Sequence, residues 1–345
     1  MNKTKKIWII VACTAVAAGL LIALIAAIIG GNSLFSNDIQ REMKIYSVDE
    51  DFTNISINNT EYDILIRPSE NTKCTVECLK EEKLYHTVEV TGDTLTITEV
   101  NKKKWYENFY FGIFPSNWTE LCLTVYLPKE EYENLYLKTT SGDISVESKI
   151  AFTDIELHNT SGDVALSDIT AENVSAKSTS GDVLIRNSDI KSELFLKSTS
   201  GDAKANDIKA GKLTSESTSG DIIFKSAEIK NDMLANTTSG EIEFFDVNAN
   251  DIAVKSTSGD ACFKDSISKG RLFAKTVSGD IEFERCDGKN IDFQSTSGEI
   301  DGSLLTGKKF ITNTTSGDIR VPSDSGTDEC VISTVSGDIE IYVVK

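Results

Sequence analysis

An acidic side chain directly follows a glycine at eleven nearly evenly spaced places in the chain. If the copies stack, their carboxylates lie about 5 Å apart in one column. Like charges at that distance repel by about 1 kcal/mol even in water. Bound Ca²⁺ would compensate them, because it takes oxygen ligands. The structural alternative is that each carboxylate accepts a turn N–H or pairs with a lysine.

The eleven acids are Asp143, Asp163, Asp182, Asp202, Asp221, Glu241, Asp260, Asp280, Glu299, Asp318 and Asp338. Among them, the candidate calcium ligands are Asp143, Asp163, Asp182, Asp202, Asp221, Asp260 and Asp280. The glycine-rich nonapeptide of calcium-binding β-rolls is absent from the sequence. No other cofactor is expected.

A small hydroxyl residue stands three places before the same glycines. The residues are Thr139, Ser178, Ser198, Ser217, Thr237, Ser256, Thr276, Ser295, Thr314 and Thr334, with Asn159 in the remaining copy. Strand parity points them inward, which predicts a buried hydrogen-bond ladder between copies. No histidine or lysine base recurs with them, so nucleophilic catalysis is unsupported. The two histidines of the sequence lack catalytic or metal-ligand spacing.

An aromatic cluster follows three lysines, Lys102–Lys104, in the one long insertion that breaks the strand pattern. Aromatic side chains next to cations suit a membrane surface, a glycan or a partner protein. The alternative is a folded cap over the open end of the core. The candidate binding residues are Trp105, Tyr106, Phe109, Tyr110, Phe111 and Trp118.

The acids, hydroxyls and glycines belong to one repeat, Thr-Ser-Gly-Asp. Its glycines are spaced 19 or 20 residues apart, which indicates a repeat architecture. They are Gly142, Gly162, Gly181, Gly201, Gly220, Gly240, Gly259, Gly279, Gly298, Gly317 and Gly337. Apolar residues alternate with polar ones on both sides of each glycine, which is the period of a strand.

Each copy therefore carries two short strands joined by a Ser-Gly-Asp/Glu turn, in which the glycine is expected to adopt positive φ. The remaining residues are expected to form a surface return loop with a third inward apolar residue, such as Ile190 or Ile267. Stacking buries the apolar rows that one copy cannot bury alone. The fold class is all-β: a parallel β-solenoid of about eleven 19–20-residue rungs. A propeller is the rival, but it would need alternating copies.

The rest of the chain divides into four segments. Residues 1–6 are basic and are expected to form a cytoplasmic tail; residues 7–29 are an uncharged apolar run long enough to span a bilayer as one helix. A cleaved signal peptide is the alternative. Residues 30–48 are expected to be a linker, and 49–134 irregular β rungs that cap the repeat of 135–345.

These features resemble a bacterial family of membrane-anchored β-strand repeats of unknown function that carries the label putative adhesin. The resemblance rests on the lysine-flanked anchor, on the strand ending at Val125–Pro128 and on the repeated Thr-Ser-Gly-Asp-Ile, and it covers about residues 45–345. It implies a cell-envelope location. It provides no catalytic residues.

The expected protein is therefore a single-pass membrane protein with most of its chain outside the cytoplasm, acting as a non-catalytic binding or scaffolding rod. Its partners are the membrane and an unknown envelope protein or glycan. The net charge of −19 argues against nucleic acid. Two alternatives remain: an accessory partner of an envelope-stress sensor, and a polysaccharide-active β-helix enzyme. An open strand edge at the last rung also predicts end-to-end association.

Overall fold

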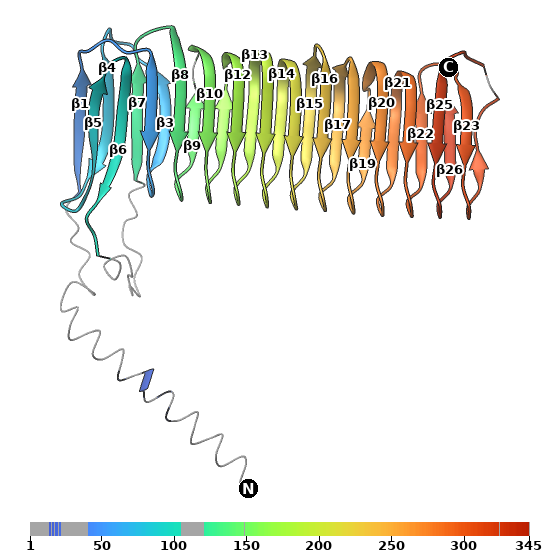
Figure 1. Ribbon diagram of the computed structural model, residues 1–345, viewed down its shortest axis with the longest axis horizontal. Helices are drawn as coiled ribbons and strands as arrows, with labels where there is room; N and C mark the ends of the chain where they lie inside the picture. The colour runs from blue at the N-terminus through green and yellow to red at the C-terminus, as the bar shows by residue number, and fades with distance from the viewer. Residues whose placement is uncertain are drawn as a thin grey trace.

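The chain folds into an all-β rod in which short strands stack side by side along one axis (Figure 1). A computed structural model describes residues 41–104, 121–147, 149–323 and 325–344, together with Thr14, Val16, Ala18, Gly19 and Leu21. Within these residues no helix has the length and apolarity needed to cross a membrane. Most of the predicted anchor, 7–29, lies outside them.

Two groups of strands make up the rod. The strands before the repeat are β1 (Glu42–Val48), β2 (Asn54–Asn58), β3 (Asp63–Pro68), β4 (Cys74–Lys80), β5 (Leu84–Thr91), β6 (Thr94–Asn101) and β7 (Cys122–Leu127). Those of the repeat are β8 (Glu131–Lys138), β9 (Ile144–Glu147), β10 (Ala151–His158), β11 (Val164–Ser167), β12 (Thr170–Lys177), β13 (Val183–Lys197), β14 (Ala203–Glu216), β15 (Ile222–Ile229), β16 (Asp232–Asn236), β17 (Ile242–Ala249), β18 (Asp251–Lys255), β19 (Ala261–Lys264), β20 (Ile267–Lys275), β21 (Ile281–Gln294), β22 (Ile300–Leu304), β23 (Lys309–Asn313), β24 (Ile319–Arg320), β25 (Glu329–Ser333) and β26 (Ile339–Val343).

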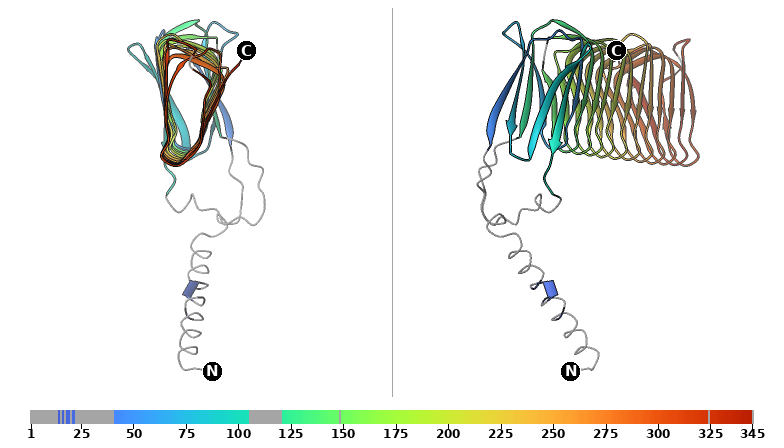
Figure 2. Two further views of the ribbon diagram at one scale, coloured as in Figure 1. Left: turned by 90° about the vertical axis from the view of Figure 1, so that its right-hand side faces the viewer. Right: turned by 60° about the vertical axis from the view of Figure 1, so that its left-hand side comes forward.

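The repeat strands pair in parallel and in register with their equivalents in the next coil. Val164, for example, lies between Ile144 and Val183, the corresponding residues of its two neighbours. Viewed along the rod, the coils superimpose as flattened loops (Figure 2). This is the predicted parallel β-solenoid, with about ten turns. The glycines lie in one file, not around a ring, which rejects the propeller.

The core is a set of apolar ladders that run along the inside of the coils. One ladder stacks Phe224 on Phe244, with ring centroids 5.4 Å apart, and continues edge-to-face to Phe263 at 5.5 Å. The third inward column was predicted correctly at Ile190, which is fully buried, but wrongly at Ile267, which is 40% exposed. In that coil Ser266 and Ser268 are buried on either side of Ile267.

The repeat glycines are required by close stacking and not by positive φ. A Cβ built on Gly220 would lie 1.9 Å from the carbonyl oxygen of Gly201, and the other repeat glycines meet the coil beneath them in the same way. Within the described part of the chain, only Gly92 and Gly302 are glycines with positive φ. The expectation of a left-handed glycine turn was therefore wrong.

Positive φ occurs instead at a second corner, six residues after the glycine. It is adopted by Asp168, Asn187, Asp207, Ser226, Asp246, Asp265 and Arg285, with φ between 49° and 58°. Beyond this corner the predicted return loop is mostly strand, and in β13, β14 and β21 the strand assignment runs through the corner without a break. Each coil thus has two corners and little loop.

A divergent coil precedes the repeat. β2 pairs in parallel with β6 and β8, and β3 with β7 and β9, so the strands of 54–68 lie second in the stack although they come earlier in sequence. Tyr62 occupies the place of the glycine, because Gly142 packs on its carbonyl. Its ring is buried edge-on against His86, with centroids 4.5 Å apart.

Antiparallel strands close this end of the rod. β4 pairs with β7, β1 with β4, and β5 with β6, all antiparallel. We call residues 42–101 with β7 the proximal cap. Residues 42–48, which the sequence placed in the linker, form its outer strand β1.

The other end of the rod is permuted. β25 lies between β21 and β23, and β26 lies between β22 and β24. The coil of residues 309–320, which we call the distal coil, is therefore outermost, as Figure 1 shows at the right. The expectation that the last coil in sequence would be the last in space was wrong.

The stacked glycines give a stability prediction. Gly220→Ala forces a methyl group into the carbonyl of Gly201, so we expect a loss of about 3 kcal/mol in unfolding free energy. Ser226→Gly, in the same coil, relieves a left-handed backbone and should leave stability unchanged or raise it by up to about 1 kcal/mol. Denaturant unfolding followed by circular dichroism measures both. A Gly220→Ala chain as stable as wild type would show that the stacking contact does not require glycine.

Candidate functional site

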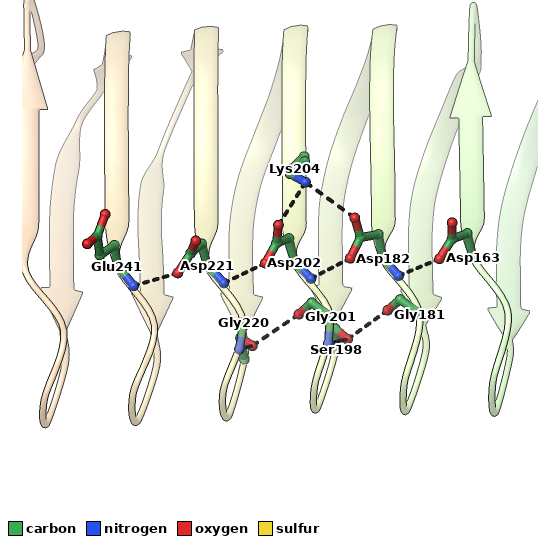
Figure 3. A network of polar contacts seen from close by, with 11 residues as sticks. Asp163, Gly181, Asp182, Ser198, Gly201, Asp202, Lys204, Gly220, Asp221 and Glu241 are labelled. Atoms are coloured by element: carbon green, nitrogen blue, oxygen red, sulfur yellow. Dashed lines mark hydrogen bonds and ion pairs between the residues drawn. The ribbon is translucent and has the colours of Figure 1, made fainter.

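The acids after the glycines form one column on the surface, as predicted, and Figure 3 shows its central part. The Oδ1 atom of Asp163 accepts the backbone N–H of Asp182 at 2.8 Å, and the Oδ1 of Asp182 accepts that of Asp202 at 2.8 Å. The same bond recurs between other neighbours, from Asp63–Asp143 to Asp338–Asp318. The aspartates of the column thus accept backbone N–H groups, as the structural alternative expects.

Lys204 adds a cation to the column. Its Nζ lies 2.8 Å from Asp202 and 3.3 Å from Asp182 (Figure 3). Burial acts to raise the pKa of Asp202, but hydrogen bonds from Lys204 and from the Asp221 N–H outweigh it and leave that pKa below its usual value. The bond to Asp202 in turn raises the pKa of Lys204. Both groups are thus held in their charged forms.

The hydroxyl column is a buried ladder, again as predicted. Ser198 donates to the carbonyl of Gly181 at 2.9 Å and accepts the N–H of Gly201 at 3.0 Å. Asn159, the exceptional residue, does the same with its amide, donating to Gly142 and accepting from Gly162. Most of these side chains bond to glycine backbones, and Thr139 donates to the carbonyl of Tyr62, so the column connects neighbouring coils.

A second acidic column accompanies the first along the distal half of the rod. Three places after the glycine, Glu243, Cys262, Glu282, Asp301 and Glu340 are successive neighbours across paired strands. We call these acids and the first-column acids of the same coils the acidic face. Its members are Glu241, Glu243, Asp260, Asp280, Glu282, Glu299, Asp301, Asp338 and Glu340.

Crowding on the acidic face shifts its protonation equilibria. Burial, followed by the charges of Asp301, Asp260 and Asp280, raises the pKa of Glu282. Burial and neighbouring acids likewise raise the pKa values of Glu241 and Asp301. Burial raises the pKa of the Cys262 thiol to about 12, so it stays neutral between its acidic neighbours. The negative charges of the acidic face are thus only partly compensated by neighbouring groups.

The sequence reasoning missed this second column. Its signal was present, since four of the copies have an acid three places after the glycine. Strand alternation places that residue on the same outward face as the first acid. The position varies along the rod, from Ser145 to Leu184 to Lys204, and this variation concealed the run of acids in the distal half.

The predicted aromatic cluster, Trp105 to Trp118, lies outside the described residues. The described chain next to it is held at one corner of the proximal cap. There the side chain of Glu81, 5% exposed, pairs with Arg41 at 3.0 Å and with Lys103 at 2.7 Å. The start of the described cap and the start of the insertion are therefore fixed to the same carboxylate.

The two histidines occupy different environments. His86 is buried in the proximal cap, and burial lowers its pKa to about 4. His158 lies on the surface and pairs with Glu156 at 2.8 Å. Across the described ranges, no group of three or more His, Cys, Asp or Glu side chains is arranged to hold a metal ion.

The family model of the Toastrack DUF4097 family matches residues 52–260 and 230–345, which together span most of the chain. The chain belongs to this family. The match includes the Toastrack coils, the acidic column and most of the proximal cap. No curated protein matches the chain.

Several solved structures are similar to this Toastrack chain. A "putative adhesin" from Parabacteroides distasonis is 17% identical, with a TM-score of 0.42, and the match covers 88% of this chain and 98% of that one. A "putative adhesin" from Parabacteroides merdae is 16% identical, with a TM-score of 0.42, covering 89% and 98%. A "putative lipid binding protein" from Parabacteroides distasonis is 17% identical, with a TM-score of 0.37, covering 90% and 98%.

The crowding on the acidic face gives opposite predictions for two glutamates on β21. The pKa of Glu282 is raised in the fold, so its ionised form destabilises the fold at neutral pH and this penalty disappears as pH falls through that pKa. Glu282→Gln should raise the melting temperature at pH 7 by about 1 °C. The gain should vanish well below pH 4.5, the ordinary pKa of glutamate.

Glu284 is the matched control. A hydrogen bond from Lys264, at 2.7 Å, lowers its pKa, with a further contribution from Arg285. Glu284→Gln should therefore lower the melting temperature at pH 7. Calorimetry measures the melting temperature of both variants across pH. Changes of the same sign at pH 7 would contradict the role of crowding.

Calcium binding by the first column stays a prediction. One oxygen of each of these aspartates accepts a backbone N–H, so only the second oxygen could bind a cation, and at Asp182 and Asp202 that oxygen already pairs with Lys204. If Ca²⁺ binds, millimolar Ca²⁺ should raise the melting temperature of the full chain, and Mg²⁺ should do so less. Titration calorimetry without heat of binding and without a thermal shift would reject it.

Proposed function

We propose that the protein is a non-catalytic binding or scaffolding rod, anchored in the cell membrane by residues 7–29 with the solenoid outside the cytoplasm. The observation that carries the proposal is the acidic face, a flat and regular surface on a rigid stack of coils. A rigid array of like charges can bind an extended cationic partner without rearranging. We expect that partner to be an envelope protein or a glycan with cationic groups.

Anchoring is supported by the sequence. The apolar run of 7–29 has the length of a spanning helix, and the lysines before it favour a cytoplasmic N-terminus. Arg41 and Lys103 both pair with Glu81. We propose that Trp105, Tyr106 and Trp118 contact the membrane surface or a partner.

The polysaccharide-active alternative has less support. Such an enzyme needs a cleft in which acids cluster with a base. An open hollow of about 490 Å³ in the proximal cap contains one acid, Glu70, and one lysine, Lys73, among hydroxyl and amide residues. The family description carries no activity.

The binding function is tested by capture from envelope extract with the full chain solubilised in detergent. Neutralising the second column by Glu243→Gln, Glu282→Gln and Asp301→Asn should abolish capture, because these carboxylates carry the uncompensated charge. The bound partner should also be released by salt.

The matched control removes three acids elsewhere on the rod, by Glu172→Gln, Glu193→Gln and Glu228→Gln. Each of these pairs with a lysine, at 3.3, 3.6 and 3.5 Å. The control should capture as wild type does. Equal capture by the neutralised face would reject the acidic face as the binding surface. Co-purification of a membrane sensor with the anchored chain alone would favour the accessory-partner alternative.

A further inference from the structure

The distal coil presents two strand edges on its outer side. Of the described strands, β23 pairs with β25 and β24 pairs with β26, and no described strand lies beyond them. Apolar side chains of the same coil are exposed: Ile311 is 45% exposed and Ile319 42%. An edge with exposed apolar residues is a template for another strand.

Hydrogen bonds show which backbone groups of β23 face this edge. The Lys309 N–H donates to Asp328 at 2.8 Å, and the Asn313 carbonyl accepts the Thr334 N–H at 3.0 Å. These residues therefore face β25. Because alternate residues of a strand point their backbone groups to opposite sides, the N–H and C=O of Thr312 point to the open edge.

The distal coil is fixed to the rod by a buried cation. Lys308 is 2% exposed, and its Nζ lies 2.6 Å from Asp287 and 2.8 Å from the Gly288 carbonyl, with Asp328 at 3.8 Å. Removing a partner from such a buried charge costs several kcal/mol. The edge is thus held in place, which lowers the entropy cost of pairing with it.

The chain itself shows how such an end is covered. At the other end, antiparallel β4 and β5 lie on the outermost parallel strands β7 and β6. A second copy turned by a two-fold rotation would present its own β23 and β24 antiparallel to these strands. The same two edges then satisfy each other in a closed, isologous contact.

Charge favours a second copy at this end over contact along the rod. Residues 309–320 contain Lys309, Arg320 and one acid, Asp318, so the distal coil lacks the excess of acids that gives the whole chain its net charge of −19. Two acidic rods repel along their sides, and the distal coil is where that repulsion is weakest. Antiparallel pairing of β24 about Ile319 also places each Asp318 opposite Arg320 of the second copy.

We propose that two copies of the chain join end to end through their distal coils, with β23 and β24 continuing both sheets as antiparallel strands. The proximal caps then lie at the two far ends of a doubled rod. This proposal does not depend on the binding function proposed above.

Sedimentation of the full chain in detergent tests it. Wild type should be a dimer. Thr312→Pro removes the N–H on the open edge but no bond to β25, and it should weaken dimerisation at least about tenfold. Thr312→Val keeps the N–H and should dimerise as wild type does. Ile311→Glu should also give monomers, whereas Leu234→Glu, at the equivalent place of an interior coil, should not.

Two results would overturn the proposal. One is a wild-type chain that stays monomeric up to its solubility limit. The other is a Thr312→Pro or Ile311→Glu chain that melts as wild type does and still dimerises equally, which would place the contact elsewhere, for example in the anchor.

Discussion

The rod depends on a backbone contact at one corner of every coil that leaves no space for a side chain. The carbonyl of one repeat glycine occupies the place where the Cβ of the next would be. The hydroxyl before the glycine bonds to that carbonyl, and the acid after it accepts a backbone N–H from the neighbouring coil. The Thr-Ser-Gly-Asp repeat is thus one unit of inter-coil bonding, and it holds every other column in register.

Because the coils stack in exact register, equivalent residues of successive coils lie side by side. This arrangement has an electrostatic consequence wherever the equivalent residues are charged. The carboxylates of the first acidic column are stabilised by the hydrogen bonds that they accept from backbone N–H groups, and in one place by the ion pair with Lys204. The carboxylates of Glu282 and Asp301 in the second column have no such backbone bond among the described contacts, and burial together with neighbouring acids raises their pKa values. The first column is therefore bonded into the stack, whereas the second places like charges side by side without such bonds.

Sequence reasoning predicted what is local and repeated. The 19–20-residue period of the repeat predicted the parallel solenoid, and strand alternation predicted the buried hydroxyl ladder. It misread the glycine, because positive φ and close approach both require the same residue. It missed the second corner, where Asp168, Asn187 and Arg285 share a conformation but no residue type. Asp and Asn tolerate left-handed φ better than most residues, which is only a weak signal.

The ends of the rod were the hardest to predict. Near-identical coils fit one another almost equally well, so the sequence of a single coil does not determine its place in the stack. Tyr62 stands in the place of a repeat glycine, and its ring packs on His86 of the proximal cap, a contact that the repeat does not predict. Packing between whole coils likewise decides the position of β25 and β26, which lie between the distal coil and the rest of the rod.

That insertion bears on how the molecule is assembled during its synthesis. Residues 309–320 leave the ribosome before residues 329–343, yet the later segment separates them from the preceding coil. The distal coil therefore cannot pair with its final neighbours, β25 and β26, until those strands have been translated. Coils nearer the cap can add one by one as they emerge, whereas this last step must wait, and a chain that stops early would leave the end of its core unsealed.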